Sequence, residues 1–123
     1  MKVSVISPIF GFDDIKDMEL EEVDEFFYLL KAGDISFTLI NPATVREYEL
    51  VIPKNYQNIL QVEDESDIKV FNIVTILNPI EKSTINFLAP IVINMRKQLL
   101  VQVPLDEQKY KEFGLNESIE KYL

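Results

Sequence analysis

The strongest constraint on the fold of this chain is its excess of side chains branched at Cβ. The 123 residues include 15 Ile, 11 Val and 4 Thr but only 3 Ala. Such side chains lose rotamer freedom in a helix and pack well on a pleated sheet. The length allows one hydrophobic core, and 47% hydrophobic with 27% charged residues is a globular composition. We therefore predict a single, mostly β domain spanning residues 1–123.

The spacing of apolar residues supports strands in the first half of the chain. Apolar and polar side chains alternate over residues 35–41, which is typical of a half-buried strand. Residues 26–30 are apolar on both faces, as in a strand that is covered twice. Residues 31–34 lie between these runs, and Gly33 can adopt the positive φ of a tight turn. The pattern predicts a β-hairpin.

The second half of the chain has the same character. Residues 68–77 and 84–93 are apolar runs, and Pro90 predicts a bend or bulge in the second because it lacks a backbone donor. Residues 94–97 resemble a turn, after which residues 98–105 place their apolar side chains on one face. Short strands with frequent turns predict a small antiparallel β-barrel-like or sandwich domain.

One or two short helices complete the prediction. The first begins at Pro53, a residue tolerated at a helix start, and Tyr56, Ile59 and Leu60 follow at helical spacing. The second is capped by Asn116. Its apolar positions are Ile119, Tyr122 and Leu123.

The charge is strongly negative and unevenly distributed. There are 21 Asp and Glu against 12 Lys and Arg, a net charge of −9, and the acidic residues concentrate in residues 13–25 and 63–67. This charge repels phosphate backbones, so we predict no direct nucleic-acid binding. It would speed encounters with a basic protein, although solubility alone also accounts for it.

Several kinds of chemistry are excluded by composition. The chain has no Cys, His or Trp, which removes thiol nucleophiles, disulfides, Cys/His zinc sites and His-dependent catalysis. The adjacent Asp13 and Asp14 fit a solvated loop, and residues 63–67 lack the spacing of a calcium loop. We predict no catalytic, cofactor or metal site. An enzyme or small-molecule binder that used the barrel interior would need a polar cavity there.

The location is predicted to be cytoplasmic. No apolar stretch reaches the roughly 18 residues of a membrane helix, so no membrane association is expected. The first residues contain one short apolar run, broken by Pro8, and lack the features of a secretory signal.

Two groups of residues have alternative interpretations. Four asparagines lie in or beside apolar strands, where they either satisfy strand ends and bulges or line a recognition surface. They are Asn41, Asn72, Asn86 and Asn94. Phe10 and Phe12 flank Gly11 and either anchor a partner or close the core.

Five sequence segments together resemble the FliW family of flagellar assembly factors. They are PIFGFDD (8–14), SFTLINP (36–42), VFNIVTI (70–76), STINFLAPIVIN (83–94) and QVPLD (102–106). Their order and spacing agree with the family over nearly the whole chain. The chain resembles the short form of the family, because its N-terminus is shorter than in many members and its turn at residues 95–97 lacks the usual glycine.

The resemblance implies a non-enzymatic, barrel-like regulator that acts through protein contacts. It implies binding to CsrA, the RNA-binding repressor of flagellin translation, and to flagellin, which competes for the same factor. A generic flagellin-binding, chaperone-like domain without CsrA binding is the alternative. The free chain is expected to be a monomer.

Charge and exposure suggest where these partners bind. We expect CsrA to contact the acidic residues next to the family-like strands, with a second candidate pair after them. The first set is Glu63, Asp64, Glu65 and Asp67, and the second is Asp106 and Glu107. We expect flagellin to contact an apolar patch at Phe10 and Phe12.

Overall fold

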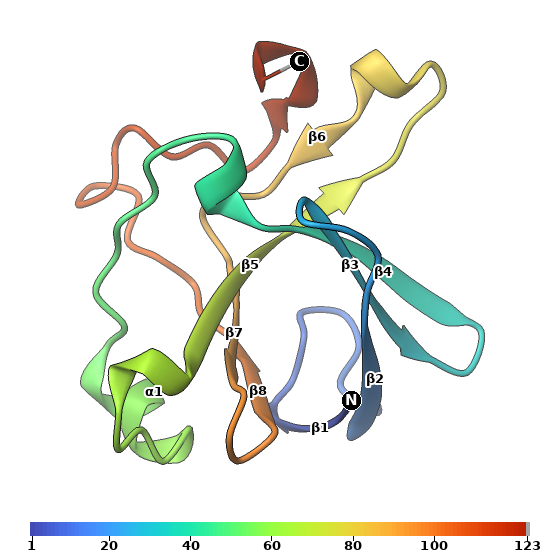
Figure 1. The fold of residues 1–123 in the computed structure, drawn as a ribbon. Coiled ribbons are helices and arrows are strands. Elements are labelled where there is room, and N and C mark those ends of the chain that lie inside the picture. The colour runs from blue at the N-terminus through green and yellow to red at the C-terminus, as the bar shows by residue number, and fades with distance from the viewer. Residues whose placement is uncertain (123) are drawn as a thin grey trace.

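The computed structural model describes residues 1–122, and seven of its strands close into a barrel (Figure 1). The order around the barrel is β1-β2-β3-β4-β5-β7-β8, closed by pairing of β8 with β1. All neighbours are antiparallel except β1 and β8. The strands are β1 (Lys2–Ser7), β2 (Asp17–Glu22), β3 (Phe27–Ala32), β4 (Ile35–Ile40), β5 (Ile68–Thr75), β7 (Ile91–Asn94) and β8 (Leu99–Gln102).

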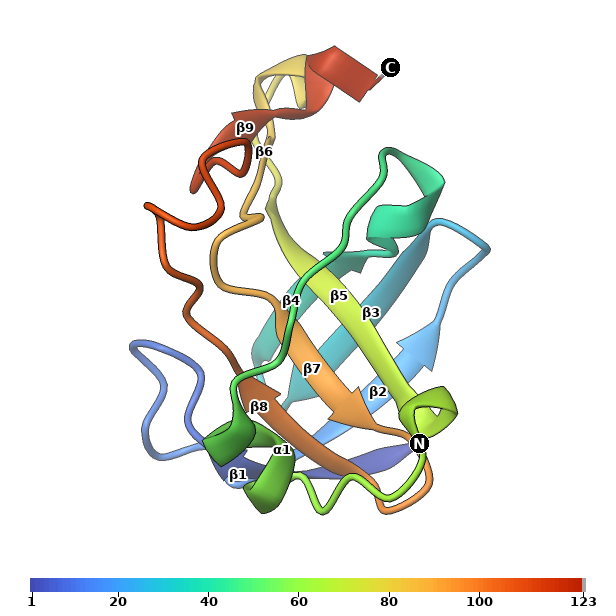
Figure 2. The same cartoon turned by 90° about the vertical axis from the view of Figure 1, so that its left-hand side faces the viewer.

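Two short strands and the helical segments lie outside the barrel. β6 (Thr84–Ile85) pairs with the end of β5, and β9 (Glu117–Ser118) pairs with β6. Figures 1 and 2 show them at the end of the molecule opposite α1 (Lys54–Ile59). The 3-10 turns are η1 (Pro42–Thr44), η2 (Glu65–Asp67), η3 (Ile80–Lys82) and η4 (Ile119–Tyr122).

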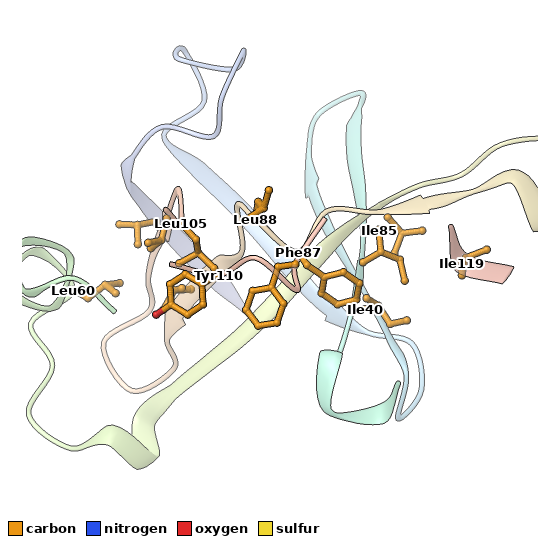
Figure 3. Packing of buried hydrophobic residues seen from close by; sticks show 13 residues of the cluster. Ile40, Leu60, Ile85, Phe87, Leu88, Leu105, Tyr110 and Ile119 are labelled. Carbon is orange, nitrogen blue, oxygen red and sulfur yellow. The ribbon is translucent and has the colours of Figure 1, made fainter. Parts of the chain in front are cut away.

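The barrel wall separates two apolar cores. Along β7, Ile91 and Ile93 face the barrel interior, whereas Val92 faces an outer core. The outer core includes Leu60, Phe87, Tyr110 and other residues from the segments that wrap the barrel (Figure 3). Since successive side chains of a strand point to opposite faces, burial on both faces explains why the central strands are apolar without alternation.

The structure confirms the predicted fold class and most of the predicted strands. The chain from residue 27 to 40 is a β-hairpin, with Gly33 at φ +57° in its turn. The apolar run at residues 84–93 is divided into β6 and β7 around Pro90. The apolar face of residues 98–105 packs in the outer core through Leu99, Val101, Val103 and Leu105.

The sequence did not predict β1 or β2. β2 lies within the acidic stretch, where buried Met18 and Leu20 alternate with exposed charged residues. The density of acidic residues therefore hides a strand that is half-buried.

The predicted helix near Pro53 is confirmed as α1, whereas the predicted C-terminal helix is replaced by β9 and η4. Pro53 precedes the first helical residue of α1. Of the three expected apolar positions, Tyr56 is partly buried, Leu60 directly after α1 is fully buried, and Ile59 is 43% exposed. Asn116 does not cap a helix. Residues 117–118 pair with β6 as β9, and a 3-10 turn follows. The predicted apolar position Leu123 lies outside the described residues.

The four asparagines have structural roles. Asn41 caps η1, and the side-chain oxygen of Asn86 accepts hydrogen bonds from two backbone N–H groups at the break between β6 and β7. The side-chain amide of the buried Asn72 donates to the Asn86 carbonyl and to the hydroxyl of Tyr48. Burial raises the pKa of Tyr48 to about 12, so its hydroxyl stays protonated. These contacts favour the structural interpretation over a recognition surface.

Asn94 connects the end of α1 to the β7–β8 turn. Its Nδ2 donates to the Leu60 carbonyl at 2.9 Å, and its Oδ1 accepts from the backbone N–H groups of Arg96 and Lys97. Replacing Asn94 by alanine should lower the free energy of unfolding by about 2–3 kcal/mol, because the buried Leu60 carbonyl and two partly buried backbone N–H groups lose their partners. Urea unfolding measures this difference. The exposed Asn55→Ala is the control, and equal stability of the two variants would contradict the assigned role.

Candidate functional site: two surfaces and a clasp

The acidic segment, defined as residues 63–67, is a fixed turn before β5. Asp64 caps η2, because its Oδ1 accepts from the Ser66 backbone N–H at 2.9 Å and from the Ser66 hydroxyl at 2.8 Å. Glu63 Oε1 lies 2.8 Å from Lys97 Nζ on the β7–β8 turn. At the other end of the segment, the backbone N–H of Met95 donates to the Asp67 carbonyl at 2.8 Å, so the segment is held at both ends.

These contacts divide the four carboxylates into two pairs. The hydrogen bond and charge of Lys97 lower the pKa of Glu63, and the hydrogen bonds from Ser66 lower the pKa of Asp64. Both groups already have partners within the molecule. Within residues 1–122, no side-chain hydrogen bond or ion pair engages the carboxylates of Glu65 and Asp67. Their charge is thus available to a partner.

Asp106 and Glu107 form a separate feature. Both are exposed, and Asp106 accepts a hydrogen bond from the Gln108 backbone N–H at 2.9 Å, which fixes a turn. Among the described residues, no hydrogen bond or ion pair joins this turn to the acidic segment. The two predicted acidic sets are therefore not linked to each other by hydrogen bonds or ion pairs.

The loop after β1 presents one aromatic ring to solvent. Phe10 is 56% exposed, whereas Phe12 is half-buried and makes an edge contact with Phe37 at 5.0 Å between ring centroids. The backbone N–H of Phe10 donates to Oε1 of the buried Gln102 at 2.8 Å. Gly11 has φ +87°, which strongly favours glycine. The Phe10 ring is therefore displayed on a fixed backbone.

A partly buried clasp holds the C-terminal segment to the rest of the molecule, and the sequence did not predict it. The guanidinium of Arg46 lies 5.1 Å from the ring centroid of Phe87 and 5.0 Å from that of Phe113. Its NH1 is 3.2 Å from Glu117 Oε2, and the Tyr122 hydroxyl donates to Glu117 Oε1 at 2.7 Å. We call the ion pair between Arg46 and Glu117, with these aromatic contacts, the clasp.

The electrostatics of the clasp favour a charged Glu117. Burial, the largest single influence, raises the pKa of its carboxyl group. Hydrogen bonds from Tyr122, Gly114 and Lys121, together with the charge of Arg46, outweigh burial and leave this pKa below its ordinary value. The clasp therefore stabilises the folded protein as an ion pair.

The barrel interior is filled by apolar side chains. Val3, Leu30 and Leu39 are fully inaccessible there, and Phe71 is nearly so. This packing weighs against the polar cavity that an interior active site would require. Within residues 1–122, no cluster of three or more acidic side chains is arranged to hold a metal ion, and none of the helices is long and apolar enough to cross a membrane.

Comparisons with known proteins agree with the resemblance seen in the sequence. Residues 2–113 match the family described as FliW protein. The chain is 41% identical over 127 aligned positions to the flagellar assembly factor FliW of Campylobacter lari, covering all of this chain and 97% of the relative. It is 37% identical to the flagellar assembly factor FliW 2 of Wolinella succinogenes, covering 99% of this chain and 92% of the relative.

A solved structure shows the same fold. The crystal structure of the flagellar assembly factor FliW superposes with a TM-score of 0.85 at 29% identity, over 96% of this chain and 84% of the other. The family match extends from β1 to Phe113, so it includes the barrel, the acidic segment and the Phe10 loop. The chain belongs to the FliW family of flagellar assembly factors.

Proposed function

We propose that this protein is a cytoplasmic, non-enzymatic antagonist of the translational repressor CsrA, and that flagellin competes with CsrA for it. Membership of the FliW family is the observation that carries the proposal. Rising free flagellin captures the factor, frees CsrA and stops flagellin synthesis. Export of flagellin reverses the switch. The factor itself binds neither nucleic acid nor membrane and is monomeric when free.

The net charge of −9 suits an antagonist of an RNA-binding protein. A repressor that holds RNA must present basic surface, and an acidic factor is steered toward it and repels phosphate nearby. A negative coupling of roughly 1–3 kcal/mol between factor and RNA lowers RNA affinity by about 5–150-fold, and the effect is reciprocal. No catalytic step is needed.

CsrA is proposed to bind at the acidic segment, that is, at Glu63, Asp64, Glu65 and Asp67. The free carboxylates of Glu65 and Asp67 support this choice, since the other two have partners within the molecule. Asp106 and Glu107 are the second candidates. They are exposed on a separate turn, which fits either a contact at the edge of the interface formed by the acidic segment or a contact in a second interface.

Flagellin is proposed to bind at the Phe10 loop. A large aromatic ring held on a fixed backbone loses little conformational entropy on binding, which favours its use as an anchor. Phe12 packs against Phe37, which supports the loop, and it completes the apolar patch. The loop therefore offers one anchoring ring and one supporting ring.

Replacing Phe10 by alanine should weaken flagellin binding by about tenfold or more and leave the unfolding temperature nearly unchanged, because the ring is exposed. Calorimetric titration with purified flagellin measures the affinity. The control is Leu115→Ala, since Leu115 is also an exposed apolar residue. Full flagellin affinity in Phe10→Ala would remove this surface from the proposal.

The function as a whole is tested by RNA displacement. CsrA is bound to a fluorescent fragment of its flagellin leader RNA, and the protein is added while anisotropy is recorded. We expect the RNA to be released, and addition of flagellin to restore the CsrA–RNA complex. RNA that stays bound to CsrA at saturating factor would contradict the proposal, and flagellin binding alone would then favour the chaperone-like alternative.

A further inference from the structure

An apolar pocket lies beside the acidic segment. Its volume is about 290 Å³, and it is formed by the chain before α1, by α1 itself and by the segment entering β5. The apolar lining comes from Leu50, Val51, Ile52, Val62 and Ile68. A space of this size accommodates a large apolar side chain from a partner.

Hydrogen bonds fix the walls of the pocket. The side-chain amide of Gln57 donates to the Ile52 carbonyl at 2.7 Å, which ties α1 to the preceding chain. The Val51 backbone N–H donates to the Tyr110 hydroxyl at 2.9 Å, and the Val62 N–H donates to the Gln57 carbonyl. The pocket therefore exists before a partner binds, so little ordering cost accompanies binding.

One wall of the pocket carries an apolar side chain that is unusually exposed to solvent. Val51 lines the pocket and is 64% exposed, the highest exposed fraction of any large apolar residue in the part of the chain that the structure describes. Val51 is exposed beside the partly buried Leu50, Ile52, Val62 and Ile68, and an exposed apolar side chain that adjoins other apolar residues in a pocket marks an interaction site more often than an isolated one does. The core of the molecule does not use Val51, which leaves it available to a partner.

Charge at the rim indicates the chemistry of that partner. Glu65 lines the pocket, and Asp67 lies on the same 3-10 turn. Neither carboxylate has a side-chain hydrogen bond or ion pair within residues 1–122, whereas Glu63 is occupied by Lys97. Lys54 is the single cation of α1. The rim is thus complementary to a cationic group beside the apolar side chain that enters the pocket.

We infer that this pocket receives an apolar side chain of the basic repressor CsrA, from a segment in which a Lys or Arg lies close enough to pair with Glu65. The inference rests on the proposed function and adds an anchoring site to it. The acidic rim accelerates encounter, and the apolar contact lengthens the lifetime of the complex. The two contributions should respond differently to salt, because only the ionic one is screened.

The test compares Val51→Ser with Glu65→Gln in the full-length protein, using purified CsrA at two salt concentrations. We expect Val51→Ser to weaken CsrA binding by about tenfold at both salt concentrations. Glu65→Gln should weaken binding mainly at low salt. The control is Ile80→Ser, since Ile80 is 57% exposed but lies on η3 at the opposite end of the molecule from α1 (Figures 1 and 2). Thermal unfolding verifies that all three variants are folded.

The outcomes separate this inference from the proposed function. Normal CsrA affinity of Val51→Ser, with binding by the wild type intact, would overturn the pocket assignment and leave the proposed function standing. Loss of flagellin affinity rather than CsrA affinity would assign the pocket to flagellin and overturn the inference. A wild-type protein that does not bind CsrA would overturn both.

Discussion

Replacing Glu117 by alanine should lower the free energy of unfolding by about 3 kcal/mol. The substitution removes the carboxylate that pairs with Arg46 and leaves a guanidinium beside two aromatic rings without its counter-charge. It also frees the Gly114 backbone N–H and the Tyr122 hydroxyl, which now donate to Glu117 at 2.7 Å each. For a domain of this size, the unfolding temperature should fall by roughly 10 °C. Calorimetric or urea unfolding measures the change.

The effect of Glu117→Ala should depend on pH. Since the folded-state pKa of Glu117 lies below its ordinary value of 4.5, its ion pair contributes full stability above that value. The contribution is lost as the pH falls through the lowered folded-state pKa. Wild type and variant should therefore differ most near neutral pH and converge in acid.

The control for the clasp is Glu120→Ala. Glu120 is an exposed acidic residue on η4, and its removal should change stability by less than about 0.5 kcal/mol. A Glu117→Ala protein as stable as Glu120→Ala would contradict the clasp. A stability difference that stayed constant into acid would contradict the electrostatic explanation of it.

Reversing the charges of Glu65 and Asp67 together should weaken CsrA binding by about 10–100-fold at low salt and flatten its salt dependence. These two carboxylates are chosen because Glu63 and Asp64 hold the segment in place through Lys97 and Ser66. The double variant Glu65→Lys/Asp67→Lys therefore changes the charge offered to CsrA without removing the contacts that fix the turn. Titration at two ionic strengths measures both effects.

A matched control keeps the same net charge. Glu25→Lys/Asp34→Lys reverses two exposed carboxylates on the β2–β3 and β3–β4 turns. This control variant should bind CsrA more weakly only through the general loss of negative charge, so its effect should be small. Equal affinity losses in the two double variants would show that total charge matters and that the acidic segment has no special role.

The fold was largely predictable because its strands are recognisable from local patterns. The hairpin at Gly33, the break at Pro90 and the buried face of residues 98–105 each follow from a few neighbouring residues. β2 escaped prediction because acidic residues alternate with buried Met18 and Leu20, and its acidity suggested a loop. Local composition can conceal periodicity where one face of a strand is highly charged.

The candidate surfaces were only partly predictable because they depend on contacts between distant segments. Arg46 and Glu117 are 71 residues apart in the sequence, and no local pattern pairs them. The acidic segment is visible in the sequence, but the pairing of Glu63 with Lys97 is not. In the same way, the sequence marks Phe10 and Phe12 as equivalent, whereas the fold exposes one ring and packs the other against Phe37.

The most direct test of the proposed switch is a competition titration by calorimetry with purified CsrA and flagellin. The account predicts that the protein binds each partner alone, that flagellin at saturation abolishes CsrA binding, and that raising the salt concentration weakens the CsrA complex more than the flagellin complex. A protein that binds neither partner, or that binds both at once with unchanged affinities, would contradict it.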